Sequence, residues 1–214
     1  MEKLIIRNER ENERAEVENL IREAFWNVNV PGCDEHYLAH VLRGHGDFVP
    51  ALDLVAELDG RVVGNVMYTR AWLEDEAGNE RGILTFGPVA VLPEYQRRGV
   101  SRALLEESFV RARAMGCETI VIFGNPDNYV SRGFKSCRRF NVCLKGGVFP
   151  SAMLVRPLTE DAFDGRRWFY RESAAYEIDP AEAERFDRKF PPKEKAFRPS
   201  QEEFYIHNHS VIRD

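Results

Sequence analysis

The chain has 214 residues, a length that suits one large domain or one domain with an appended lobe. Hydrophobic residues make up 43% and charged residues 30% of it, so an ordinary buried core is expected and disorder is not. The net charge of −5 argues against a protein that coats nucleic acid, because such a protein needs a basic face to displace counterions.

Hydrophobic periodicity and turn residues predict the elements of the first half of the chain. Residues 12–26 carry the apolar stripe of an amphipathic helix, with Asn12 as its expected N-cap. The pair Asp59-Gly60 is typical of a two-residue hairpin turn of type I′. In chain order, we expect a strand at residues 3–7, helices at 12–26 and 34–42, and strands at 52–58, 61–72 and 82–91.

The second half of the chain alternates helices and strands and then changes in composition. We expect a helix at 101–115, a strand at 118–123, a short helix at 127–131, and strands within 134–144 and 152–155. This order predicts an α/β (α+β) protein with a mixed sheet and helices on both sides. The composition shifts at about Pro157, so we expect a first domain at residues 1–156 and a C-terminal extension or small lobe at 157–214.

The turn between the strand at 82–91 and the helix at 101–115 is the most informative segment. Gly99 lets the backbone approach a ligand closely, and the helix start presents unpaired N–H groups with a partial positive charge. Three arginines add cationic charge to an otherwise acidic protein. The predicted diphosphate cradle consists of Gln96, Arg97, Arg98, Gly99, Val100, Ser101 and Arg102.

Gly87-Pro88 interrupts the strand that leads to this turn. Proline cannot donate to a β-ladder and glycine often marks a bulge, so we expect strand pairing to fail there. The backbone groups of Val89, Ala90 and Val91 would then be free to bind an extended ligand that carries amides. The pantetheine arm of coenzyme A is such a ligand.

Two motifs now indicate a family. The segment QRRGVS at residues 96–101 resembles the Q/R-x-x-G-x-G/A acyl-CoA-binding motif of the GCN5-related N-acetyltransferase (GNAT) family, with Ser101 where Gly or Ala is usual. The segment GNPDNYVSRGF at residues 124–134 is similar to the Y-x-x-x-G-F element of a bacterial subgroup. The resemblance covers about residues 1–150 and implies a mostly antiparallel central sheet flanked by helices.

The resemblance also implies an activity, the transfer of an acetyl group from acetyl-CoA to a primary amine by direct attack on the thioester. It places the oxyanion donors on backbone N–H groups near Val89 and Ala90, and it makes Tyr129 the general acid for the departing thiolate. Asn125 either contacts the pantetheine arm or only forms the turn before Pro126.

The sequence offers several candidates for the general base and does not single one out. Many relatives carry a glutamate eleven positions before the motif glutamine, where this chain has Thr85, which can hold a relay water but cannot act as a base. Weaker candidates are Glu57, His36, His40 and His45.

Other features limit the partners that we expect. His207-Asn208-His209 looks like a metal pair on a strand, but no third ligand lies near it in the sequence, so we expect no metal. The four cysteines form no C-x-x-C pair, and the N-terminal residues contain no long apolar stretch, which favours a cytoplasmic protein without a membrane partner. A homodimer through exposed strands or the C-terminal extension stays open.

Three functional hypotheses follow. The first is an N-acetyltransferase for a small-molecule amine, because an acidic surface attracts a cationic amine. An acidic surface attracts a basic peptide equally, so acetylation of a peptide or protein amine is an alternative. Because Thr85 stands at the usual base position, a non-catalytic acyl-CoA-binding or sensory module is a third hypothesis.

The aromatic residues 168–170 are expected in a strand core or, alternatively, in the wall of the acceptor pocket.

Overall fold

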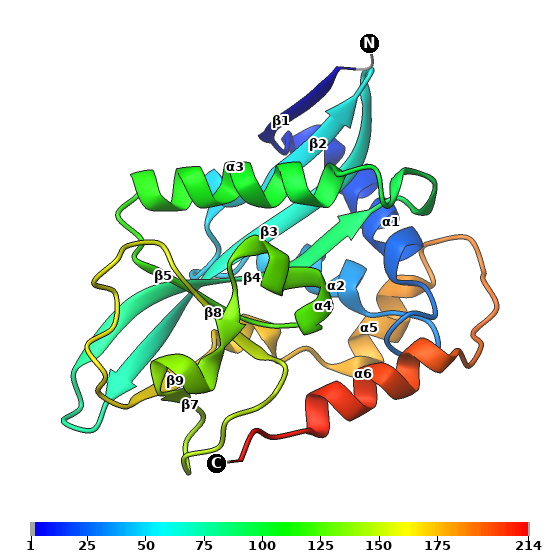
Figure 1. Ribbon diagram of the computed structural model, residues 1–214. Coiled ribbons are helices and arrows are strands. Elements are labelled where there is room, and N and C mark those ends of the chain that lie inside the picture. The colour runs from blue at the N-terminus through cyan, green and yellow to red at the C-terminus, as the bar shows by residue number, and fades with distance from the viewer. Residues whose placement is uncertain (1–2, 214) are drawn as a thin grey trace.

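The computed structural model describes residues 3–213, and nine strands of this part form one mixed sheet (Figure 1). The strands are β1 (Leu4–Asn8), β2 (Leu54–Leu58), β3 (Arg61–Asp75), β4 (Glu80–Val91), β5 (Thr119–Phe123), β6 (Lys135–Ser136), β7 (Val142–Cys143), β8 (Met153–Pro157) and β9 (Trp168–Arg171). The helices are α1 (Arg14–Phe25), α2 (Glu35–Leu42), α3 (Val100–Ala114), α4 (Pro126–Tyr129), α5 (Pro180–Asp187) and α6 (Pro199–His209). Within residues 3–213, every helix is too short or too polar to cross a lipid bilayer.

The sheet is mostly antiparallel, as expected. Its main path runs β1-β2-β3-β4-β5-β8-β6, while β9 pairs with both β3 and β7. The pairs β4–β5 and β7–β9 are parallel, and the others are antiparallel. Because β3 is 15 residues long, its first half pairs with β2 and its end pairs with β9 along the same side.

Helices cover both faces of the sheet, as alternation along β3 requires. Val66 and Tyr68 join the core cluster that contains Leu104 and Leu105 of α3. Met67, between them, joins the second cluster with the buried residues of α1 and α2. Figure 1 shows α3 lying across one face, with α1 and α2 on the other. The predicted layers are therefore confirmed.

The start of the first helix differs from the prediction. A 3-10 turn at Glu11–Glu13 precedes α1, so Asn12 lies inside this turn and is not the N-cap. The Glu13 carboxylate accepts the backbone N–H of Arg10 at 2.8 Å and pairs with Arg7 at 2.6 Å. This buried carboxylate, with its two partners, holds the backbone that leads into α1, the role predicted for the Asn12 side chain.

Two turns show how local chemistry sets strand ends. Asp59 and Gly60 have φ values of 48° and 84°, which confirms the type I′ turn between β2 and β3. In the region predicted as strand at 134–144, a 3-10 turn at Cys137–Phe140 separates the short strands β6 and β7. The Ser136 hydroxyl accepts the N–H of Arg138 at 3.2 Å and so caps that turn.

The C-terminal residues pack onto the rest of the chain. The predicted strand core at 168–170 is confirmed, because β9 pairs with β3 and the side chains of Trp168 and Tyr170 are buried. On α5, Asp187 pairs with the buried Arg22 of α1 at 2.6 Å and lies 3.1 Å from Nε2 of the buried His36 on α2. The domain boundary between residues 156 and 157 stays a prediction.

Candidate active site

A β-bulge breaks the regular pairing of β4 where the sequence predicts it. Val66 pairs with Val89 and Tyr68 pairs with Phe86, so the two residues Gly87-Pro88 oppose Met67 alone. Two residues against one is the defining feature of a bulge. The bulge bends β4 immediately before residues 89–91, the predicted binding segment.

Beyond this point β4 also diverges from β5. In residues 3–213 the parallel ladder between these strands consists of the pair Leu84–Ile120, so the later residues of β4 have no strand partner on that side. Val89, Ala90 and Val91 pair with β3 along one edge, and their other edge faces the opening between β4 and β5. The backbone of this segment therefore has no strand partner on that side, as the interrupted strand predicts.

The N-terminus of α3 is open to an anion. Gly99, at the N-cap position, has φ 84° and no side chain caps the helix in the part of the chain that is described. The first backbone bond of the helix runs from the N–H of Ala103 to the carbonyl of Gly99 at 3.0 Å. The N–H groups of Val100 and Ser101 therefore precede the intrahelical ladder and carry the positive end of the helix dipole.

A small cavity of about 130 Å³, which we call the α3 cradle, lies at this helix start. It is lined by Val91, Tyr95, Gln96, Arg97, Gly99, Val100, Ser101, Arg102 and Arg132. The structure thus brings together all the predicted cradle residues except Arg98, whose guanidinium lies 5.3 Å from the centre of the Tyr95 ring. Gln96 donates from Nε2 to the carbonyl of Val91 at 3.1 Å and so ties the turn to the end of β4.

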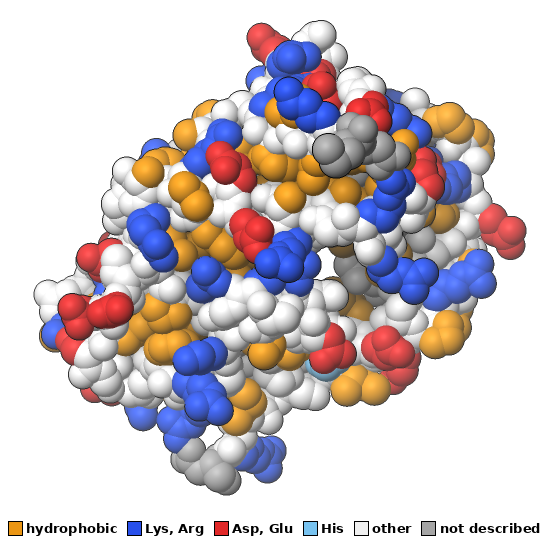
Figure 2. All heavy atoms as spheres, turned by 45° about the horizontal axis from the view of Figure 1, so that its top comes forward, with side chains coloured by type: hydrophobic (Ala, Val, Ile, Leu, Met, Phe, Trp, Pro, Cys, Tyr) orange, Lys and Arg blue, Asp and Glu red, His pale blue; other side chains and the backbone are white. Residues whose placement is uncertain are grey.

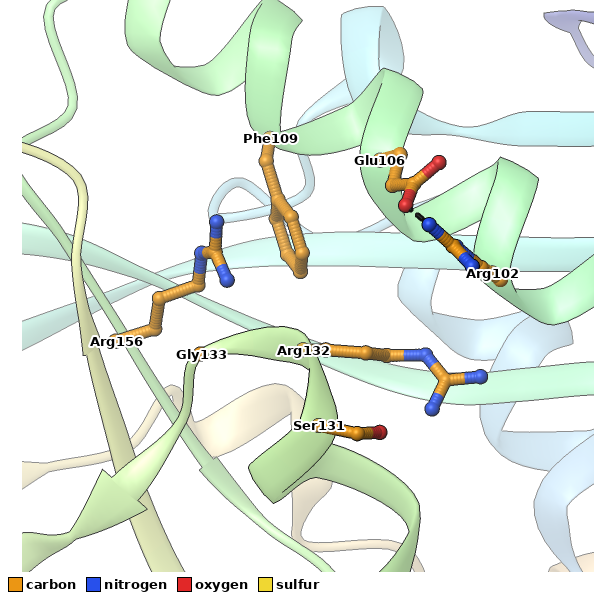
Figure 3. A pocket seen from close by; sticks show the side chains of 7 residues that line it. All are labelled: Arg102, Glu106, Phe109, Ser131, Arg132, Gly133 and Arg156. Carbon is orange, nitrogen blue, oxygen red and sulfur yellow. Dashed lines mark hydrogen bonds and ion pairs between the residues drawn. The ribbon is translucent and has the colours of Figure 1, made fainter.

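A larger cavity of about 460 Å³, which we call the arginine pocket, adjoins the cradle and shares Arg102 and Arg132 with it. Figure 3 shows that α3 contributes one wall, the segment around Arg132 a second, and Arg156 of β8 a third. Arg102 is bound to Glu106 at 2.7 Å, and the Arg156 guanidinium lies 4.3 Å from the centre of the Phe109 ring.

Two arginines of this pocket were missed by sequence reasoning. The Nε atoms of Arg132 and Arg156 are buried and have no hydrogen-bond acceptor among residues 3–213. Arg132 directly precedes Gly133-Phe134 of the Y-x-x-x-G-F element, which is the signal that could have found it. Nothing in the sequence places Arg156 beside α3, because the pairing of β8 with β5 brings it there.

The face of the molecule in Figure 2 contains a hollow. Lys and Arg side chains gather on both sides of it, and Asp and Glu side chains lie below it (Figure 2). A chain with a net charge of −5 thus carries a local basic region. Such a region attracts a phosphorylated ligand in spite of the overall charge.

Tyr129 ends the short helix α4 and packs into an aromatic group. Its ring centre lies 5.8 Å from that of Phe86 on β4 and 5.7 Å from that of Phe134. Burial raises the pKa of the Tyr129 phenol to about 12, so the hydroxyl is protonated at neutral pH. A Cβ atom added to Gly124 would lie 2.5 Å from Cε2 of Tyr129, so the absence of a side chain at Gly124 allows this ring position.

Asn125 is the N-cap of α4. Its side-chain oxygen accepts the N–H of Asp127 at 3.0 Å, and Pro126 follows at the first helical position. Of the two predicted roles for Asn125, the turn-forming one is therefore present. The residue also lines a separate cavity that includes Thr85 of β4, so a ligand contact stays a prediction.

The third cavity, which we call the α6 cavity, has a volume of about 490 Å³ and lies on the side of β4 near α2. Thr85, Phe86 and Gly87 of β4 line it, as do residues of α2 and α6. Tyr176 also lines it and donates its hydroxyl to the carbonyl of Gly87 at 3.4 Å. Its four carboxylate residues are Asp34, Glu35, Glu172 and Glu203.

The weaker base candidates lie away from these cavities. Glu57 accepts the Nε–H of Arg7 at 2.8 Å. Burial lowers the pKa of His36 to about 4, and this ring packs between α2 and α5. His40 and His45 are exposed, and each lies beside a carboxylate. None of these four lines the α3 cradle, the arginine pocket or the α6 cavity, as described for residues 3–213.

The expected strand position of His207-Asn208-His209 is wrong. These residues end the helix α6, where His207 and His209 cannot alternate as neighbours on one face of a strand. The carbonyl of Tyr205 lies 2.8 Å from Nδ1 of His209. Among residues 3–213, no three His, Cys, Asp or Glu side chains lie together in a way that could hold a metal ion.

Comparisons with known proteins agree on one family. The sequence model of the acetyltransferase (GNAT) family matches residues 15–136. A curated relative, the uncharacterized N-acetyltransferase YjhQ of Escherichia coli strain K12, is 36% identical over 88 residues, or 41% of this chain. The match covers 48% of YjhQ, so the chain spans about half the length of this relative.

Solved structures resemble most of the chain. The GNAT family N-acetyltransferase YhbS of Escherichia coli, solved with CoA, is 24% identical with a TM-score of 0.71, and the match covers 83% of this chain and 94% of that one. A GNAT family acetyltransferase of Brucella melitensis, solved with acetyl-CoA, is 25% identical with a TM-score of 0.65, over 81% and 98% of the two chains. The family match covers more than half of the sequence, and this chain belongs to the GNAT family of acetyltransferases.

Proposed function

We propose that this protein is an acetyl-CoA-dependent N-acetyltransferase that acetylates a primary amine of a small molecule. One observation carries the proposal. The unpaired edge of β4 at residues 89–91, the uncapped start of α3 and the Tyr129 ring packed on Phe86 all adjoin the opening between β4 and β5. The acetyl-CoA bound to the Brucella melitensis relative supports the identity of the ligand.

The ligand would bind through backbone groups and arginines together. The pyrophosphate would lie in the α3 cradle, where the N–H groups of Gly99, Val100 and Ser101 and the helix dipole favour an anion. Arg132 and Arg156 carry buried Nε–H groups without acceptors among the described residues, which suits a further phosphate. The pantetheine amides would then pair with the free edge of β4 at residues 89–91.

The chemistry would need two groups on the acetyl side. A backbone N–H near Val89 or Ala90 would bind the oxyanion that forms when the amine attacks the thioester. The Tyr129 phenol would donate a proton to the CoA sulfur as the C–S bond breaks. Because its pKa is raised to about 12, the phenol carries its proton throughout the neutral range. It is a weaker acid than the CoA thiol, so it would transfer this proton to the sulfur as it takes up a proton from the amine nitrogen.

Calorimetry and a thiol-release assay test this function together. Titration with acetyl-CoA should give binding heat, and primary amines should then release CoA thiol. Tyr129→Phe should keep the affinity for acetyl-CoA and lower kcat by about 10²-fold, the lower range for a general acid. Absence of heat from both acetyl-CoA and CoA would refute the proposal, and binding without any thiol release would favour a non-catalytic acyl-CoA-binding module instead.

The acidic α6 cavity favours a small amine over a peptide acceptor. Its volume of about 490 Å³ suits a small molecule. A protein amine would present a flexible lysine with its neighbouring residues, and the same assay with a lysine-rich peptide measures that alternative. The cytoplasmic location and a homodimer stay predictions.

A further inference from the structure

The α6 cavity differs from the rest of the site in its charge. Four carboxylate residues line it, and among the described residues that line it there is no lysine or arginine. The cradle and the arginine pocket, by contrast, contain four arginines, Arg97, Arg102, Arg132 and Arg156. The opening between β4 and β5 therefore separates a basic side, suited to phosphates, from an acidic side, suited to a cation.

The last helix forms a fixed wall of this cavity. Glu203 and Phe204 of α6 line it. The helix is anchored to the loop between α1 and α2, since Ser200 donates to the carbonyl of Val28 at 2.8 Å and Gln201 donates to the carbonyl of Asn27 at 3.1 Å. Gln201 is itself buried. The C-terminal residues thus enclose the space beside β4 and limit the size of an acceptor.

Glu35 is the carboxylate held most firmly in this cavity. It lies in the first turn of α2, and its Oε1 accepts the Nδ2–H of Asn29 at 2.7 Å. Its Oε2 accepts the backbone N–H of Asp34 at 3.2 Å. Both oxygens are therefore oriented before a substrate arrives, which is a requirement for efficient proton transfer.

The surroundings of Glu35 set its charge. Burial, with a smaller contribution from Asp34 beside it, raises the pKa of Glu35 to about 7. The groups that share the cavity are Asp34 before α2, Glu172 after β9, Tyr176, and Glu203 and His207 of α6. A carboxyl with this pKa is ionised above about pH 7 and protonated below it. It can therefore accept a proton near neutral pH and release it to solvent afterwards.

We propose that Glu35 is the general base of this protein and that the α6 cavity binds a small cationic amine with an apolar body. This inference rests on the proposed acetyltransferase function. The acidic residues would attract the ammonium group, and the apolar body would pack on Leu38, Phe123, Phe204 and Ile178, which line the same cavity. Thr85, at the position of the usual glutamate, lines the cavity too and can hold a water between Glu35 and the amine.

Acetylation removes two protons from the ammonium nitrogen. The ammonium gives one proton to the Glu35 carboxylate, directly or through one water, and becomes a neutral amine. The amine nitrogen forms a bond to the thioester carbonyl carbon, and the C–S bond then breaks. The CoA sulfur takes a proton from Tyr129, and the second proton that the nitrogen loses restores the phenol. Glu35 releases its proton to solvent, so one proton is released for each acetyl group transferred.

The test measures kcat/KM for Glu35→Gln between pH 5.5 and 9. The probes are tyramine, phenylethylamine, cadaverine and a lysine-rich peptide, with CoA release as the readout. Gln keeps the shape of the side chain and the acceptor for Asn29, and Glu35→Asp is the conservative second variant. Glu202→Gln is the matched control, because Glu202 lies on α6 but is exposed and does not line the cavity.

In the wild type, kcat/KM should fall tenfold per pH unit below about pH 7, because the base becomes protonated. Glu35→Gln should lose this dependence and lower kcat/KM at pH 7.5 by about 10²-fold or more. Glu35→Asp should keep the fall of kcat/KM at low pH, with a lower kcat/KM throughout. If kcat/KM of Glu35→Gln still fell below about pH 7 as in the wild type, or if only KM changed, Glu35 would not be the general base. The acetyltransferase function would stand in either case.

Failure of the proposed acetyltransferase function would give a different result in the binding and thiol-release assays. Wild-type protein that binds acetyl-CoA in calorimetry but releases no CoA with any of the four amines would overturn the function and Glu35 with it. Turnover of the peptide without turnover of the small amines would overturn the cavity as the acceptor site. Faster turnover of phenylethylamine than of cadaverine supports an apolar body, since phenylethylamine carries an aromatic ring where cadaverine carries an alkyl chain that ends in a second ammonium group.

Discussion

Gly124→Ala should damage catalysis without loss of acetyl-CoA binding. The added Cβ would lie 2.5 Å from Cε2 and 3.1 Å from Cδ2 of Tyr129. Carbon atoms pack at about 3.5–4.0 Å, so the ring must move by about 1 Å. Phe86 and Phe134 pack against this ring, and Phe134 is fully buried, so these two side chains restrict the movement of the Tyr129 ring.

The expected magnitudes follow from this movement. A displacement of about 1 Å at a catalytic group costs on the order of 10²-fold in rate, so kcat should fall to roughly the level of Tyr129→Phe. The collision should also lower the free energy of unfolding by about 1–3 kcal/mol, the usual range for overpacking. The affinity for CoA should not change, because the cradle proposed to hold the pyrophosphate lies at the start of α3.

The assay combines steady-state thiol release, calorimetry with CoA and urea unfolding. Gly82→Ala is the matched control, because Gly82 also has a φ outside the left-handed region and an added Cβ there meets nothing within 4 Å. It should behave as wild type in all three measurements. Wild-type kcat in a folded Gly124→Ala variant would show that the position of the Tyr129 ring does not matter for the reaction, and the role proposed for Tyr129 would be wrong.

Two further predictions concern binding and stability. Arg132→Ala should weaken CoA binding in calorimetry by about 10-fold to 150-fold, the range for a hydrogen bond to a charged group. Arg185→Ala, on the exposed face of α5, is the control and should leave the affinity unchanged. Equal affinities of the two variants for CoA would show that Arg132 is not part of the binding site. Asp187→Ala should lower the free energy of unfolding in urea by about 3–5 kcal/mol, because the side chain of Arg22 is only 1% exposed and would lose its charged partner. A loss below about 1 kcal/mol would mean that solvent reaches Arg22 in the variant.

The bulge and the helix start on the proposed CoA side of the site could be predicted from the sequence, because their signals are local. The QRRGVS segment lies on consecutive residues, and a strand, a glycine turn and a helix start fix its geometry within a few positions. Gly87-Pro88 marks a bulge by its own backbone chemistry, and the structure contains that bulge. The local error at the start of α1 arose because the Glu13 carboxylate, which binds Arg7 and the backbone N–H of Arg10, takes the role predicted for Asn12.

The acceptor side could not be predicted in the same way. Glu35 on α2, Thr85 on β4 and Glu203 on α6 are separated by more than a hundred residues at the extremes, and no motif links them. Their shared cavity exists because β4 bends away from β5 and the C-terminal segment folds back onto the loop between α1 and α2. The pKa of Glu35 depends on that burial.

The sequence by itself indicated the family, the order of strands and helices up to about residue 156, and the turn that would hold a phosphate, because short-range backbone preferences and hydrophobic periodicity set all three. Only the tertiary structure decided which charged groups surround each cavity. Arg156 reaches α3 through the pairing of β8 with β5, and Glu35 is half-buried where α2 packs against segments distant in the chain. Burial and electrostatic environment are sums over spatial neighbours, and linear spacing does not contain them.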